Sequence, residues 1–299
     1  MVTGSASIWR RRVAHCGIWI SLAVLLYPFA NMVWQALTAH DQAGAGPRFT
    51  AEHLRLVLGL AENLDAYGRH LSAKVEFWRW VCNSLKVAVS TTLLATALAL
   101  STGYAFARLR FAARGTLDNL LYMSHFFPGM LLAVAYWCLF DRMGESFPAI
   151  GVDTHGGLML ALLGQTTLGM VWAFKGYFQQ LPKEVEEAAR IDGAGDWLTF
   201  LHIALPLARP MIAMMGLLTV TGLMYEPVLS SALLTSSGMA TLPIGLNRFT
   251  VEAGSAGGGM AVALHEFAAA ALLASLPILL AFFAAQHWMD SSLDGAVKG

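Results

Sequence analysis

The chain has 299 residues, of which 57% are hydrophobic and only 13% are charged, about half the charged share of an ordinary soluble domain. Nineteen Lys and Arg side chains balance nineteen Asp and Glu side chains, so no basic field is available to gather nucleic acid. Its three cysteines show no CxxC spacing and indicate neither a metal site nor a disulfide framework. The composition disfavours a soluble enzyme and a nucleic-acid partner, and it indicates a protein in contact with membrane lipid.

Long runs without Asp, Glu, Lys or Arg predict helices that cross a membrane. These runs cover residues 13–40, 87–107, 119–140, 154–174 and 267–289, and a sixth candidate begins at Pro210 and passes Glu226. At about 1.5 Å per residue, a run of about 21 residues covers roughly 31 Å, close to the thickness of the hydrocarbon core. We therefore predict an all-α integral membrane protein with six transmembrane helices.

The positions of the cations predict the orientation. Arg10, Arg11 and Arg12 precede the first helix, and an N-terminus in the cytoplasm places more Lys and Arg in cytoplasmic loops than in outer loops. Both termini are then cytoplasmic, and the first helix is an uncleaved anchor rather than a signal peptide. We predict two parts: residues 1–80, an N-terminal transmembrane helix with a periplasmic segment, and residues 81–299, the membrane core.

The loop at residues 181–210 predicts a short amphipathic helix. Pro182 suits the first helical position, and Gly193 is a natural stop. Three carboxylates complement the positive end of the helix dipole: Glu184, Glu186 and Glu187. Glu186 is also spaced to form an i,i+4 pair with Arg190. Such a polar helix between two membrane spans indicates a docking element.

Small residues and prolines support this interpretation. Ala188 and Ala189 leave a low-profile patch that another protein can approach closely, while Pro206 and Pro210 set how the chain turns back towards the membrane.

The spacing in this loop resembles a known pattern. Glu187-Ala188-Ala189 is followed after three residues by Gly193, and after nine more by Ile203-x-Leu205-Pro206. This resembles the EAA loop of ABC importer permeases, a specific signal because several positions are fixed over twenty residues. In that family, the loop forms a coupling helix in a cleft of the ATPase subunit. The resemblance implies an ABC type I importer permease fold and assigns ATPase coupling to Glu184, Glu186, Glu187, Ala188, Ala189, Asp192, Gly193, Ile203, Leu205 and Pro206.

Further stretches resemble the maltose/maltodextrin branch of these permeases, the MalG-type subunits. They lie at residues 104–111, 140–145, 153–157, 175–178 and 295–299. The resemblance implies a multi-pass protein of the cell inner membrane, paired with a MalF-type permease, two MalK-type ATPase subunits and a periplasmic maltose-binding protein. In the resembled subunit the tail reaches the ATPase interface, so a second contact is expected at Ala296, Val297, Lys298 and Gly299; a frayed terminus is the alternative.

No GxxxxGK[ST] motif is present, so the chain is predicted to be non-catalytic and to bind no cofactor. ATP and Mg²⁺ would be used by the partner ATPase, whose closure would rock the two permease subunits between inward-open and outward-open states. Two alternatives stay open: a sister importer for another oligosaccharide or glycerol phosphate, and a membrane-embedded enzyme. The second is disfavoured because His265-Glu266 lacks the second histidine of HExxH, with Ala269 in its place.

Three features of the transport path are left with open roles. The segment 251–265, glycine-rich at 253–260, corresponds to a loop that enters the binding protein in the resembled subunit. It departs from the aromatic and amide-bearing loop expected there, and we expect it to be longer and more flexible. His125 and Glu226 are ionisable groups in or near spans, which favours a path role. Glu226 could instead lie at the outer interface, and His125 could be a neutral, hydrogen-bonded side chain. No sugar ligand is assigned, because the resembled complex binds sugar mainly in its other permease subunit.

Overall fold

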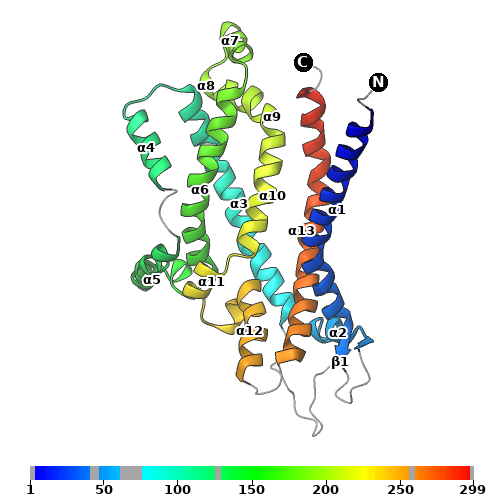
Figure 1. The fold of residues 1–299 in the computed structure, drawn as a ribbon. Helices are drawn as coiled ribbons and strands as arrows, with labels where there is room; N and C mark the ends of the chain where they lie inside the picture. Colours follow the sequence, from blue (N-terminus) through cyan, green and yellow to red (C-terminus); the bar gives the residue numbers. More distant parts are fainter. Residues whose placement is uncertain (1–3, 41–46, 61–75, 125–128, 256–259, 297–299) are drawn as a thin grey trace. The chain divides into compact units, whose positions relative to one another are not determined.

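The computed structural model describes residues 4–40, 47–60, 76–124, 129–255 and 260–296, which form helices and one short antiparallel sheet (Figure 1). The α-helices are α1 (Gly4–Leu37), α2 (Glu52–Val57), α3 (Phe77–Arg108), α4 (Arg114–Ser124), α5 (Gly129–Ser146), α6 (His155–Gln180), α7 (Lys183–Ile191), α8 (Asp196–Thr199), α9 (Leu205–Leu207), α10 (Arg209–Met224), α11 (Val228–Leu233), α12 (Leu242–Ser255) and α13 (Met260–Ala296). The 3-10 turns η1 (Pro148–Ile150) and η3 (Ser237–Met239), the π-helical η2 (Phe200–Ala204), and strands β1 (Thr38–His40) and β2 (Pro47–Phe49) complete the list.

Four helical segments among the described residues are long and apolar enough to cross a membrane. They are Arg11–Leu37, Phe77–Arg108, His155–Gln180 and Leu264–Ala284. The pair Asp196–Leu207 and Arg209–Met224 would give a fifth span, bent by 70°. The prediction of an all-helical membrane protein is therefore confirmed.

The predicted count of six spans is not confirmed. Residues 119–140 were expected to form one helix, but they are divided between α4 and α5, and residues 125–128 between these helices lie outside the described part. Helix α3 begins at Phe77 instead of Val87. The charge-free run begins only after Lys86, but the helix extends ten residues further towards the N-terminus. Arg79 and Lys86 are exposed and Phe77 is buried, so the two cations lie on the exposed side of one continuous helix.

The chain divides into two units by its internal contacts, and each is described by itself. Unit 1 consists of Met1–Phe77 and Leu246–Ser275, and unit 2 of Trp78–Gly245 and Leu276–Gly299.

In unit 1, α2 packs on the start of α13. The ring of His53 stacks on that of His265 at 5.2 Å, and His265 Nδ1 lies 2.7 Å from the carbonyl oxygen of Gln35. Burial and the neighbouring His265 lower the pKa of His53. The expected long loop at 251–265 is wrong, because α12 continues to Ser255 and α13 begins at Met260. Residues 256–259 lie outside the described part.

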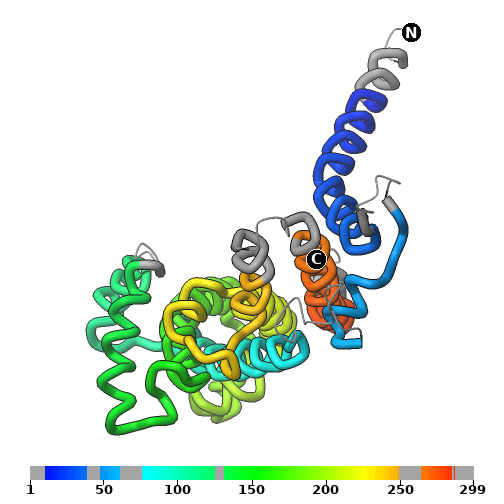
Figure 2. The backbone as a smooth tube through the Cα atoms, turned by 90° about the horizontal axis from the view of Figure 1, so that it is seen from below, coloured from blue at the N-terminus to red at the C-terminus, as the bar shows by residue number. Residues whose placement is uncertain are grey.

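In unit 2, α6 and α10 lie side by side, and α3 slants across them in Figure 1; Figure 2 shows the same helices from below. One core cluster joins α3 and α6 to the segment after α7, through buried side chains such as Leu100, Tyr104, Phe174, Phe178 and Phe200. Gly103 makes this close packing possible, since a Cβ at its position would stand 2.9 Å from the Cβ of Phe174. A second cluster joins α5, α6 and α11 at the other end of α6.

Candidate functional site

Helix α7 confirms the predicted amphipathic helix. It runs from Lys183 to Ile191, with Pro182 one position earlier than expected, at the N-cap. Its end is a Schellman motif: the N–H of Gly193 donates to the carbonyl of Arg190 at 3.1 Å, and the N–H of Ala194 donates to that of Ala189 at 2.9 Å. Gly193 has a φ of +87°, which explains why a glycine stops the helix here.

Helix α7 stands at one end of unit 2, beyond the ends of α3 and α6 (Figure 1). Five motif residues of α7 and of the turn that ends it are exposed: Glu184, Glu187, Ala188, Asp192 and Gly193. Ala189 is half-buried. The helix therefore presents carboxylates and a small-residue patch to its surroundings, as docking requires.

Glu186 differs from the other carboxylates because it is buried, with 4% of its surface exposed. Its Oε1 accepts a hydrogen bond from Arg108 Nε at 2.8 Å, and its Oε2 accepts one from the Tyr104 hydroxyl at 3.4 Å. The predicted pair between Glu186 and Arg190 is wrong: Arg190 contacts Asp196 at 3.1 Å instead. Glu186 lies on the inner face of α7, where the end of α3 supplies a better partner.

The remaining motif residues lie in the segment that follows α7. Ile203 belongs to η2, and Leu205 packs on the core cluster of α3 and α6. Pro206 is half-buried in α9. Between α9 and α10 the chain turns by 70°, next to Pro206 and Pro210, where the sequence predicted a turn. These residues therefore belong to the partly buried segment that follows α7, and not to the exposed face of that helix.

A charged cavity of about 750 Å³ lies behind α7. Its lining includes Arg108, Arg110, Arg114, Lys183, Glu186, Glu187, Arg190 and Asp196. Two ion pairs, Arg108 with Glu186 and Arg190 with Asp196, neutralise part of this charge. The cavity suits ionic contacts and is too polar for an apolar ligand.

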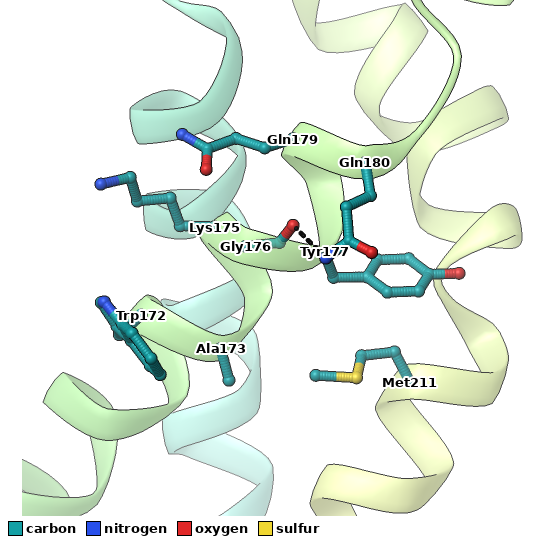
Figure 3. A pocket seen from close by; sticks show the side chains of 8 residues that line it. All are labelled: Trp172, Ala173, Lys175, Gly176, Tyr177, Gln179, Gln180 and Met211. Atoms are coloured by element: carbon teal, nitrogen blue, oxygen red, sulfur yellow. Dashed lines mark hydrogen bonds between the residues drawn. The ribbon is translucent and has the colours of Figure 1, made fainter.

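A second cavity, of about 410 Å³, lies along the last turns of α6 and the start of α10 (Figure 3). Trp172, Lys175 and Gln179 project to one side of α6, whereas Tyr177 points towards α10, on which Met211 lies. Lys175 forms an ion pair with Asp118 of α4, and the Tyr177 hydroxyl donates to the carbonyl of Leu207 at 2.8 Å. These contacts hold α4 and α9 to α6, so the residues 175–178 are structural ties.

A third cavity, of about 440 Å³, lies between α5 and α6 and was missed by the sequence reasoning. Tyr136, Gln165 and Thr166 bring hydroxyl and amide groups to its lining. The signal was present in the polar stretch Gln165-Thr166-Thr167 inside an otherwise apolar helix.

Residues 153–157 form a corner at the end of α6 opposite α7. Asp153 Oδ1 accepts the N–H groups of Thr235 at 2.8 Å and Ser236 at 2.9 Å, and Thr154 Oγ1 accepts the N–H of Gly157 at 3.1 Å. Burial raises the pKa of Asp153, but the N–H groups of Ser236 and Thr235 outweigh it and lower that pKa. A Cβ at Gly156 would overlap the carbonyl of Ala149.

Glu226 is a helix cap. Its carboxylate accepts the N–H groups of Val228 at 2.8 Å, Leu229 at 3.0 Å and Ser230 at 3.1 Å, at the start of α11. His125 and the tail residues Val297, Lys298 and Gly299 lie outside the described part, and Ala296 is the last residue of α13.

Comparison with known proteins decides the family. A model of the binding-protein-dependent transport system inner membrane component family matches residues 91–295. The chain belongs to this family. Members of the family are transport permease subunits of the inner membrane, which agrees with the apolar helices described above.

Curated relatives match over full length. The maltose/maltodextrin transport system permease protein MalG of Vibrio vulnificus (strain YJ016) is 34% identical over 303 residues, covering 100% of this chain and 99% of the relative. The proteins of the same name from Salmonella typhimurium and Escherichia coli K12 are 34% and 33% identical, with the same coverage.

A solved structure shares the fold. A chain of a bacterial ABC transporter involved in the import of the acidic polysaccharide alginate superposes with a TM-score of 0.74. It is 17% identical in sequence and covers 96% of this chain and 99% of its own. The permease fold predicted from the EAA-type spacing is therefore confirmed.

Proposed function

We propose that this family member moves maltose and maltodextrins from the periplasm to the cytoplasm as one of two permease subunits of an ATP-driven importer. The observation that carries this proposal is α7, a polar helix that exposes Glu187 and Ala188 at the end of unit 2 while its inner face is fixed to α3. The full-length relatives named MalG support the choice of cargo.

The partners follow from the same proposal. A MalF-type permease would complete the membrane pathway, and a periplasmic maltose-binding protein would deliver the sugar. Two MalK-type ATPase subunits would bind ATP and Mg²⁺, so this chain would hold no cofactor. One of them would receive α7, with Ala296, Val297, Lys298 and Gly299 as a second contact. Both termini and α7 would then face the cytoplasm.

The cavity between α5 and α6 supports an uncharged, hydroxyl-rich cargo. Tyr136, Gln165 and Thr166 line it with groups that donate and accept hydrogen bonds, and no Asp, Glu, Lys or Arg is among its described lining residues. Such a lining suits a sugar better than an anion.

The proposal is tested by reconstituting the chain with its cognate partners in proteoliposomes. We expect binding protein loaded with labelled maltose or maltodextrin to stimulate ATP hydrolysis and to drive the labelled sugar into the vesicles. The matched control omits the binding protein. Stimulation by a binding protein loaded with glycerol phosphate, or with another oligosaccharide but not with maltodextrin, would contradict the cargo and favour a sister importer.

A further inference from the structure

The inner face of α7 carries an attachment that is separate from its docking face. We infer that Arg108 and Glu186 act as positioning residues, which make α7 move as one body with the adjoining ends of α3 and α6. This inference rests on the proposed function, because α7 transmits motion only if an ATPase displaces it.

The attachment is needed because the backbone alone holds α7 weakly. Only Leu181 and Pro182 separate α7 from α6, and a short turn at Gly193 leads to α8. Two such connections leave a nine-residue helix able to pivot about both ends. A side-chain contact with a third element removes that freedom.

Arg108 supplies this contact from a distant part of the sequence. Its Nε donates to Glu186 Oε1 at 2.8 Å, and its terminal nitrogen donates to the carbonyl of Leu181 at 2.9 Å. One guanidinium therefore joins the last turn of α3, the end of α6 and the middle of α7. The guanidinium fork holds two acceptors in a fixed geometry, which a lysine does not reproduce.

Burial makes this contact hard to open. The side chains of Arg108 and Glu186 are only 5% and 6% exposed. Separating them within the protein would leave two uncompensated buried charges, which costs far more than separating an exposed pair. By contrast, Arg190 and Asp196 are 46% and 57% exposed, so their ion pair adds little rigidity.

The residues beneath the ion pair carry a displacement further into unit 2. The Tyr104 hydroxyl donates a hydrogen bond to Glu186. The centroid of the Tyr104 ring lies 5.5 Å from that of Phe178 and 5.0 Å from that of Phe200. One position earlier, Gly103 lets α3 lie directly against Phe174. A push on α7 therefore reaches α3 and α6 together through close-packed atoms.

The first test measures whether α7 and α3 move together. The native Cys16, Cys82 and Cys138 are replaced by serine, and spin labels are placed at the exposed Lys183 of α7 and Ser101 of α3. In the assembled importer, we expect the distance between the labels to stay constant between the nucleotide-free and ATP-bound states. Glu186→Gln should broaden this distance distribution when ATP binds.

The second test measures coupling. We expect Glu186→Gln to retain the ATPase on co-purification but to lower the sugar moved per ATP hydrolysed about tenfold, as expected for the loss of one charged hydrogen bond. Arg108→Lys keeps the positive charge, so we expect a smaller loss of sugar moved per ATP. This variant replaces Glu186→Gln in the test if Glu186→Gln does not accumulate in the membrane. Arg142→Gln removes an exposed cation of α5, outside the lining of the cavity behind α7, and is the matched control.

Two outcomes would overturn the inference. One is a wild-type label distance that changes by more than about 3 Å when ATP binds, beyond the roughly 1 Å shifts of packed elements. The other is a Glu186→Gln variant with unchanged sugar per ATP. If the wild-type chain fails to bind the ATPase at all, the proposed function falls and this inference with it.

Discussion

The two ends of α6 carry equally distinctive sequence stretches, yet the structure uses them in opposite ways. At the end near α7, Glu184 and Glu187 face outwards and only Glu186 turns inwards. At the other end, Asp153 and Thr154 bind groups of the chain itself, and Gly156 fills a position with no room for a side chain. A distinctive sequence stretch in this fold thus marks either an exposed face or an internal corner, and burial distinguishes the two.

The largest effect is expected at the internal corner. Gly156→Ala would force a Cβ onto the carbonyl oxygen of Ala149, and we expect a loss of stability of about 3 kcal/mol. Thermal unfolding in detergent, followed by size-exclusion chromatography, measures it. The control is Gly176→Ala in the same helix, where a Cβ would meet nothing within 4 Å and a gain of roughly 0.5–1 kcal/mol is expected. Equal stabilities of the two variants would contradict the assignment of a packed corner.

A substitution on the exposed face of α7 should change binding of the ATPase without changing the stability of the chain. Glu187→Lys reverses the charge of an exposed side chain, so we expect the melting temperature to stay within about 2 °C while ATPase co-purification falls at least about tenfold. Glu145→Lys, an exposed carboxylate at the end of α5, is the control. An importer that assembles normally with Glu187→Lys would refute the docking role.

A pH effect of intermediate size is expected at Asp153. Because its pKa is lowered in the folded chain, the charged form stabilises the protein above the ordinary value of 3.8, and this contribution is lost as pH falls through the lowered pKa. Asp153→Asn should cost about 1–2 kcal/mol at neutral pH and should remove this part of the acid sensitivity. Unfolding measured from pH 7 to pH 3 compares the two proteins, and parallel curves would count against the tie to Thr235 and Ser236.

The smallest effect is expected at Glu226. Replacement by Gln keeps an acceptor oxygen but removes the charge that faces the N–H groups of α11, so we expect a loss of about 1 kcal/mol. Transport should change by less than about twofold. A large loss of transport with unaltered stability would instead assign Glu226 to the cargo path.

Much of the architecture was predictable because apolar length and helix-stop chemistry are local properties. The spans near α1, α3, α6 and α13 follow from their charge-free runs, and Gly193 ends α7 as its conformational freedom suggests. The partner of Glu186 was not predictable, because Arg108 lies 78 residues away and only packing brings the two together. Helix spacing favoured Arg190, which the structure pairs with Asp196.

The assignment of residues 119–140 to two helices, α4 and α5, was equally hidden, since a charge-free run does not record where one helix ends and another begins. The extension of α12 and α13 into the glycine-rich segment has the same origin: glycine weakens a helix locally, but neighbouring alanines and valines sustain it up to Ser255 and again from Met260.

Helix α10 has 16 residues and reaches only about 24 Å, less than the roughly 30 Å of a hydrocarbon layer. The chain leaves this helix after Met224, and amide groups without a partner would be costly there if the turn lies inside the membrane. Glu226 takes up three of those amides and stands in for water at this turn. A carboxylate of the same chain thus supplies the acceptors that the first N–H groups of α11 need.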